Sequence, residues 1–441
     1  MLIKRLFLAF CLFLAAVTPS FAANNEAVGA AMKELVAQPS VRTGSATADA
    51  NFESIKAFYD TRSFKPVWSR DSGPKGKAKA LLGELRSSAV HGLSPGFYNV
   101  DEISKLMKST NPADLARMDF LFTGALIDFG HDLFNGRTTN LGTLPSNRVE
   151  PLRMEPAELV EKAAYAGNLR VMLGELVGDD KRYLRLISKL FELVQLENSK
   201  HWPKNLKSDD LVGLRKLLAL SGDLPAKLMV SAPVMDRPLV AALEAFQKRN
   251  GLQVDGELGP ATLTEMNRPL SERVNKIKIN IERRRWQNRP DEGTSLYFNL
   301  VDGQMKLLVD GNTAGLIPVV YNDAVSGLPT FYGDVTAIER QGKRIVLHYQ
   351  ASSLADGNDR RGTIELDDSA GTGIEQLTKI VAASDTAAVK ALGSADGKVT
   401  LNASREMFVT YLTAWATRKG SLNFRKDIYG RDARVMKELG L

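Results

Sequence analysis

The spacing of the apolar residues changes once along this chain of 441 residues, near Thr294. Before that point, apolar residues recur every three or four positions, which is typical of amphipathic helices. After it, short runs rich in β-branched and aromatic residues are separated by turn residues, which is typical of strands. The pattern therefore predicts an α+β multidomain fold, with helical domains first and a β-rich domain last.

The helical part begins after residues 23–48, which are rich in Ala, Asn, Ser and Thr and are expected to form a flexible leader. Helical spacing from Asn51 to about Ser199 predicts a first all-α domain over residues 49–200. In the segment Met118–Phe134, for example, one apolar face is expected to be formed by Phe122, Ala125, Leu126, Phe129 and Leu133. Glycine-containing turns separate the helices of this domain.

A second helical block, residues 206–268, has sharper boundaries. A short amphipathic helix at Pro238–Asn250 is ended by Gly251, because glycine readily adopts the left-handed conformation that caps a helix. Pro260 fits the first turn of the next helix. The block is predicted to be a small three-helix module.

Residues 269–292 are predicted to form a linking helix that runs from Ser271 to about Trp286. Its basic residues between Lys276 and Arg285 are expected to lie on a solvated surface. The β-rich domain then covers residues 293–441. Its predicted elements are a hairpin at 295–309 with Asp302-Gly303 as the turn, strands at Leu316–Tyr321, Arg344–Tyr349, Gly362–Leu366 and Met407–Trp415, and a helix at Gly373–Ala383.

The N-terminus has the pattern of a secretory signal peptide over residues 1–22. Lys4 and Arg5 precede the apolar run Leu6–Val17, and small residues follow it up to Ala22. The apolar run is shorter than the ~20 residues that a membrane-spanning helix needs. We therefore expect a periplasmic protein with no membrane span after signal cleavage.

The single cysteine, Cys11, lies within this segment, so the mature chain is expected to have no thiol. Disulfides, cysteine metal sites and a cysteine nucleophile are then excluded. The four histidines are widely separated, and we expect no metal and no cofactor. Removal of Lys4 and Arg5 lowers the net charge from +7 to +5, a mild excess that by itself identifies no partner, and we expect no nucleic acid partner.

The segment from Phe246 to Leu263 resembles the peptidoglycan-binding-1 module, whose pattern is FQ-x-x-x-GL-x-x-DG-x-x-G-x-x-T. This chain matches nearly every fixed position of that pattern. The resemblance implies a ligand-binding module with a mainly structural motif. The motif residues are Phe246, Gln247, Gly251, Asp255, Gly256 and Gly259.

The flanking segments are similar to large periplasmic L,D-transpeptidases. Phe58-Tyr59, Pro66-Val67-Trp68 and Asp132–Arg137 resemble their helical scaffold domain, and Phe424–Asp432 resembles their C-terminal segment. The resemblance covers about residues 50–441. It implies a protein of peptidoglycan crosslinking, in which a cysteine attacks a stem-peptide carbonyl and an upstream histidine accepts the thiol proton.

The catalytic signature of that family is (S/H)-x-G-C-(V/I)-R, and the segment Arg361–Leu366 occupies the place of its G-C-V-R part. Gly362 keeps the glycine, Thr363 stands at the position of the cysteine, and Glu365 stands at that of the arginine. His348 corresponds to the catalytic histidine. A threonine hydroxyl is a far weaker acid than a thiol, and Glu365 reverses a charge. We therefore expect a degenerate L,D-transpeptidase-like domain with no catalytic residues.

Three functions stay open from the sequence. The first is a peptidoglycan-binding, inactive homologue that acts in cell-wall organisation as scaffold or regulator of active crosslinking enzymes. The second is an atypical L,D-transpeptidase or carboxypeptidase that uses Thr363 and His348. The third is an interaction protein that recognises another protein and no glycan. For the first, Thr363 is simply a β-branched strand residue and His348 a hydrogen-bonded histidine.

Overall fold

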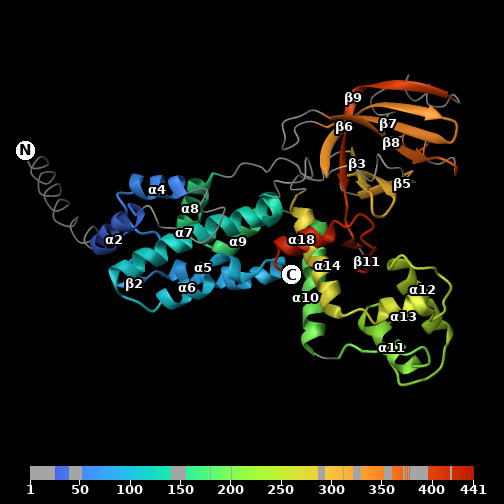
Figure 1. Ribbon diagram of the computed structural model, residues 1–441, viewed down its shortest axis with the longest axis horizontal. Coiled ribbons are helices and arrows are strands. Elements are labelled where there is room, and N and C mark those ends of the chain that lie inside the picture. The colour runs from blue at the N-terminus through green and yellow to red at the C-terminus, as the bar shows by residue number, and fades with distance from the viewer. Residues whose placement is uncertain are drawn as a thin grey trace, which may run out of the picture. The chain divides into compact units, whose positions relative to one another are not determined.

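The computed structural model divides into two compact units, residues 1–134 with 152–178, and residues 135–151 with 179–441. Figure 1 shows their helices and strands. The structure describes residues 25–38, 52–140, 155–178, 180–199, 201–286, 294–310, 312–320, 328, 330–351, 360–370, 373, 375, 377, 396–417 and 420–441. The expected signal peptide, Cys11, residues 23, 24 and 39–48 of the expected leader and most of the expected helix at 373–383 lie outside these residues. The rest of the leader corrects an expectation: it is not a flexible segment, because Glu26–Val36 forms a helix whose Val28, Met32 and Val36 pack in the core of the first unit.

The first unit is helical. Its elements are α2 (Glu26–Val36), α4 (Phe52–Thr61), a two-stranded ribbon of β1 (Ser69–Arg70) and β2 (Gly73–Pro74), α5 (Gly76–Arg86), α6 (Val100–Leu106), α7 (Pro112–Asn135) up to Phe134, α8 (Pro156–Tyr165) and α9 (Leu169–Glu175). The apolar face predicted for α7 is buried in one continuous core. A fully buried carboxylate, that of Asp119, accepts hydrogen bonds from the backbone N–H groups of Val67 (2.8 Å) and Trp68 (2.7 Å). It therefore fixes the chain between α4 and α5.

The second unit begins with two packed helices, α10 (Lys181–Ser199) and α14 (Leu270–Arg285). Between them in sequence lie α11 (Leu211–Leu220), α12 (Arg237–Arg249) and α13 (Pro260–Met266), which form a three-helix module with its own core (Figure 1). Asp236 begins α12, because its side chain accepts the N–H of Leu239 at 3.0 Å. The module predicted from the sequence is therefore helical, as expected.

The basic residues of α14 correct an expectation. Arg283, Arg284 and Arg285 are buried and do not form a solvated surface. The reason is that α10, α18 (Asp432–Glu438) and β10 (Ala414–Ala416) all pack on this helix. The three guanidinium groups pair with the carboxylates of Asp432, Asp180 and Glu282, respectively. Buried charges are stable only with such partners.

The β-rich part forms one seven-stranded sheet, ordered β5-β4-β3-β9-β6-β7-β8. Among the strand pairs of the described residues in this sheet, β3 and β9 are parallel and the others are antiparallel. A bridge between Val319 and Leu366 joins the end of β5 to β8, so the two outer strands meet. The strands are β3 (Thr294–Asn299), β4 (Gln304–Val309), β5 (Asn312–Pro318), β6 (Phe331–Gln341), β7 (Arg344–Ala351), β8 (Arg360–Asp367) and β9 (Asp396–Thr410).

One face of this sheet holds the apolar core of the domain, and we call the opposite face the outer face. In β7, for example, Leu347 lies in the core and its neighbour His348 lies on the outer face. A short ribbon of β10 and β11 (Leu422–Phe424) follows β9. The predicted hairpin is present, but its connection is Leu300–Gly303 and not Asp302-Gly303 alone.

Candidate functional site

The residues that the sequence analysis aligned with the L,D-transpeptidase signature and its histidine lie on β8 and β7. Antiparallel pairing places His348 directly opposite Thr363, so the two side chains are neighbours on the outer face. Thr363 is exposed and His348 is partly buried. The structure therefore brings together two of the residues that the alignment with the family singled out.

His348 has a further partner on β6. Its Nε2 lies 2.9 Å from Oε2 of Glu339, which is a hydrogen bond. Hydrogen bonds from Gln341 and His348 hold the pKa of Glu339 below its usual value, so this carboxylate stays ionised. The imidazole is thus hydrogen-bonded to a carboxylate on β6, and Thr363 is its cross-strand neighbour on β8.

Glu365 and Gly362 occupy different environments. Glu365 lies on the outer face and pairs with the exposed Arg344 of β7, at 3.2 Å between Nη1 and Oε2. Gly362 lies beneath Tyr349, its cross-strand neighbour, and a Cβ at this glycine would be 2.6 Å from the tyrosine Oη. The glycine is therefore explained by ring packing, and the glutamate by a surface ion pair.

The module motif is organised by one side chain, that of Gln247, which is fully buried. Its Nε2 donates to Oδ1 of Asp255 (2.7 Å) and to the carbonyl of Glu257 (2.9 Å), and its Oε1 accepts the N–H of Gly256 (3.0 Å). These bonds fold the connection between α12 and α13 around the end of α12. Buried polar groups satisfied in this way fix a loop in one conformation.

The other motif residues also have structural roles in the module. Phe246 is fully buried in the module core. Gly251 and Gly256 have φ of +67° and +69°, a region that L-residues with a Cβ rarely adopt. Hydrogen bonds from the N–H of Glu257 and from Gln247 lower the pKa of Asp255. Gly259 precedes α13 in an extended conformation, and a Cβ there would meet no atom within 4 Å.

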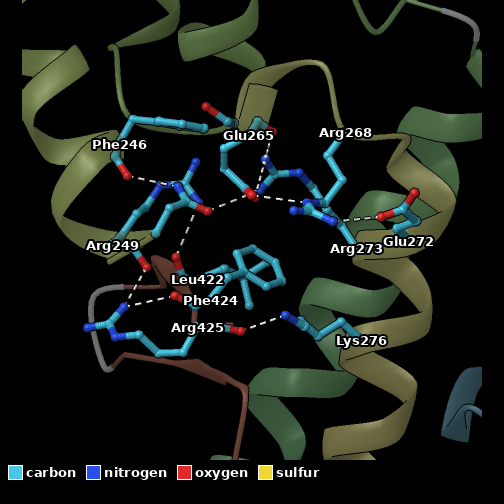
Figure 2. Close-up of polar contacts among 12 residues, drawn as sticks. Phe246, Arg249, Glu265, Arg268, Glu272, Arg273, Lys276, Leu422, Phe424 and Arg425 are labelled. Carbon is cyan, nitrogen blue, oxygen red and sulfur yellow. Dashed lines mark hydrogen bonds and ion pairs between the residues drawn. The ribbon is translucent and has the colours of Figure 1, made fainter. Parts of the chain in front are cut away.

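The module contacts the C-terminal segment, as Figure 2 shows. Arg249 at the end of α12 donates to the carbonyl of Leu422 at 3.2 Å, and Arg425 donates to the carbonyl of Arg249 at 2.9 Å. Arg425 also covers Gly251, where a Cβ would lie 3.0 Å from its Cδ. The sequence motif gave no sign of this contact, because its partners are far apart in the chain.

Arg273 of α14 completes this contact region. Its Nη2 donates to Oε1 of Glu265 at 3.0 Å, and its guanidinium lies 5.2 Å from the ring centroid of Phe424. Burial lowers the pKa of Arg273 to about 10, and Glu265 opposes that effect. The guanidinium therefore stays charged at neutral pH and links the module to the C-terminal segment (Figure 2).

A cavity of about 560 Å³ lies elsewhere in the second unit, against the outer face of β3 and β4. Its lining includes Arg182, Arg284, Lys306 and Trp415, none of which the sequence analysis singled out. Four separate segments of the chain provide them, and no local motif joins these segments. Among the described residues, no group of three or more His, Cys, Asp or Glu side chains could hold a metal ion.

Two family models match the chain. The model described as "Scaffold domain" matches residues 53–190, and the model described as "Putative peptidoglycan binding domain" matches residues 214–266. No curated protein matches it. Among the helices that the structure describes, none combines the length and apolar character needed to cross a bilayer. The two matched domains, in this order, show that the chain is a peptidoglycan-associated protein with an L,D-transpeptidase-like architecture.

Proposed function

We propose that this protein binds peptidoglycan and has a catalytically inactive L,D-transpeptidase-like domain. The observation that carries the proposal is the environment of Thr363, which stands at the position of the expected cysteine. It is an exposed residue on the outer face of a regular antiparallel strand pair. Nucleophilic hydroxyl groups need a base and a site that excludes water, and an exposed strand face does not exclude water.

The charge at the signature supports the same conclusion. Glu365 replaces the family's arginine and pairs with Arg344, whose side chain is 61% exposed. A carboxylate at this place repels an anionic substrate group and stabilises no oxyanion. The two replacements, Thr363 for the expected cysteine and Glu365 for the arginine, both oppose acyl transfer.

The retained parts support a binding role. The module keeps a complete set of contacts around Gln247, so its fold does not depend on the degenerate signature. A folded binding module joined to an inactive domain suits a scaffold or regulator of active crosslinking enzymes in cell-wall organisation. The peptidoglycan-associated domains indicate a cell-wall or periplasmic location, and the signal-like segment at residues 1–22 favours the periplasm.

The test combines two assays on the mature protein. In the first, the protein is sedimented with isolated sacculi, and we expect it in the pellet. In the second, it is incubated with disaccharide-tetrapeptide muropeptides, which are then separated by chromatography. New 3–3 crosslinks would contradict inactivity, and failure to sediment with sacculi would contradict wall binding.

A second candidate is an enzyme that uses Thr363 as nucleophile and His348 as base. The observation that favours it is the order Glu339, His348, Thr363, because a carboxylate that orients a histidine next to a hydroxyl is the pattern of an activated nucleophile. This candidate predicts that Thr363→Ala abolishes turnover of muropeptides and that Thr363→Ser retains it. Equal behaviour of both variants and wild type would exclude it.

A further inference from the structure

An exposed apolar segment of the module lies between α11 and α12, outside the sequence motif. Met229, Val230, Val234 and Met235 are 46%, 51%, 58% and 39% exposed, respectively. In the rest of the chain that the structure describes, no stretch of seven residues has more than two exposed large apolar side chains. Single exposed apolar residues are ordinary, but a group of them marks an interaction surface. We call residues 228–235 the apolar loop.

Both ends of the apolar loop contact α11. At its beginning, η5 (Ala226–Leu228) packs on α11, and Leu228 packs against the module core. At its end, Nη2 of Arg215 on α11 donates to the carbonyl of Val234 at 2.9 Å and to Oδ2 of Asp236 at 3.0 Å. Arg215 is buried, so its two hydrogen bonds fix the end of the loop on the module. The loop is thus attached at both ends, while its apolar side chains lie in solvent.

Two exposed cations border the apolar loop, Lys227 before it and Arg237 after it. Neither of them forms an ion pair with a carboxylate of the described residues. The one acidic residue between them in the sequence is Asp236, and its carboxylate pairs with the buried Arg215 at 3.0 Å. The border of the apolar loop therefore has a net positive charge.

An apolar loop with a cationic border is complementary to the surface of an anionic lipid bilayer. The apolar side chains would enter the boundary between headgroups and acyl chains, and Lys227 and Arg237 would lie near the lipid phosphates. A protein partner fits this feature less well. Each side of a stable protein interface contributes about 20–30 residues, and the apolar loop has eight.

We propose that the apolar loop is a peripheral membrane contact, which binds the surface of a bilayer that contains anionic phospholipids. Such a contact needs no membrane-spanning helix, because a few apolar side chains and nearby cations together give reversible binding. The proposal is independent of wall binding, since none of the six motif residues lies in the apolar loop. A wall-binding protein with this contact would be held between the wall and a membrane.

The test measures sedimentation of the full mature protein with unilamellar vesicles, in the absence of sacculi. One set of vesicles contains phosphatidylcholine alone, and the other contains phosphatidylcholine and phosphatidylglycerol in equal parts. We expect the protein to bind the anionic vesicles at least about ten-fold more tightly than the neutral ones, because each cation near the surface adds to the attraction. The affinity for anionic vesicles is expected to fall as the salt concentration rises.

Matched variants locate the contact, because the chain as a whole also has a basic excess. Val234→Asp places a carboxylate in the apolar loop and is expected to weaken binding to anionic vesicles about ten-fold or more. The control is Val171→Asp in the first turn of α9, where a carboxylate is favourable. Val171 is 57% exposed, close to the 58% of Val234, and its replacement is expected to leave vesicle binding unchanged.

A second pair of variants tests the cationic border. Lys227→Gln is expected to weaken binding to anionic vesicles about five-fold, because one cation near the membrane surface is lost. Lys248→Gln removes an exposed cation from the last turn of α12 and is expected to have no effect. Circular dichroism checks that all four variants fold, and the comparison of the two kinds of vesicle on wild type needs no variant.

Three results would overturn the proposal. They are no binding to anionic vesicles, equal binding to both kinds of vesicle, and equal effects of Val234→Asp and Val171→Asp. Capture of an envelope protein by wild type and not by Val234→Asp, without vesicle binding, would also overturn it and would assign the apolar loop to a protein. Sedimentation with sacculi is expected to be the same for wild type and Val234→Asp, so failure of the lipid contact is distinguished from failure of wall binding.

Discussion

His348 on β7 and Thr363 on β8 are direct cross-strand partners on the outer face of the sheet. The next residue of each strand has its side chain in the apolar core, as Ile364 shows. His348 and Thr363 are therefore part of a regular antiparallel strand pair. Its two conspicuous residues differ in environment, since Thr363 is exposed and His348 is hydrogen-bonded to Glu339.

Thr363→Ala is expected to change the free energy of unfolding by no more than about 0.5 kcal/mol, because an exposed side chain makes little packing contact. The matched control is Ile364→Ala at the next position, which is fully buried. That change is expected to cost about 2–5 kcal/mol. Urea denaturation of both variants measures the difference, and a similar loss for the two would mean that Thr363 is packed.

Gly362→Ala is expected to destabilise the β domain by about 1–3 kcal/mol, because overpacking forces neighbouring groups to move. The added Cβ would lie 2.6 Å from Oη and 2.8 Å from Cζ of Tyr349. Gly259→Ala is the control, since a Cβ there meets nothing within 4 Å and its φ is −73°. Equal melting temperatures for the two variants would show that Tyr349 can move aside.

Gln247→Ala is expected to destabilise the module by about 2 kcal/mol, because it leaves buried polar groups without partners. The control is Gln253→Ala, which changes an exposed residue of the same loop. If the motif is structural, binding to sacculi falls only in proportion to the unfolded fraction. A fully folded Gln247→Ala variant that no longer sediments with sacculi would instead indicate direct ligand contact.

Asp180→Asn is expected to cost about 2 kcal/mol, because it removes an ionised carboxylate that pairs with the buried guanidinium of Arg284. Arg284 is buried and Asp180 is partly exposed, so the loss stays below that of a fully buried pair. The control is Glu272→Gln, which breaks an exposed pair with Arg268 and is expected to cost less than about 0.5 kcal/mol. Thermal unfolding at neutral pH compares them.

The same pair predicts a dependence on pH. Burial opposes ionisation of Asp180, but Arg284 and Arg182 outweigh it and hold its pKa below the usual value. A lowered pKa in the folded state stabilises the protein above the unfolded pKa of about 3.9. This contribution is lost as the pH falls through the folded value, so wild type and Asp180→Asn should converge in stability at acid pH.

The sequence predicted those helices and strands whose signals lie within a short segment of the chain. The Gly251 boundary of α12 and strands β7 and β8 all have strong turn or alternation signals. In contrast, no strand was predicted over β6, which lies between β9 and β7 in the sheet. Its alternation is broken by a bulge between Val335 and Ala337, and its pairing with β9 joins segments far apart in the chain.

Contacts between distant segments explain the other differences. Arg283 and Arg284 were predicted to be surface residues. Their partners, Asp432 and Asp180, lie 149 and 104 positions away in the sequence, so no local pattern indicates the ion pairs. The register that aligns His348 with Thr363 is set by pairing along whole strands. The basic cavity could not be predicted, because α10, α14, the β3–β4 hairpin and the β10 segment each provide part of it.

Intact-mass spectrometry of the mature protein during incubation with a disaccharide-tetrapeptide muropeptide tests the central claim most directly. An acyl-transfer enzyme passes through a covalent acyl intermediate, so its mass increases by that of the transferred acyl group. The account predicts an unchanged mass at all times. A mass increase that is present in wild type and absent in Thr363→Ala would contradict it.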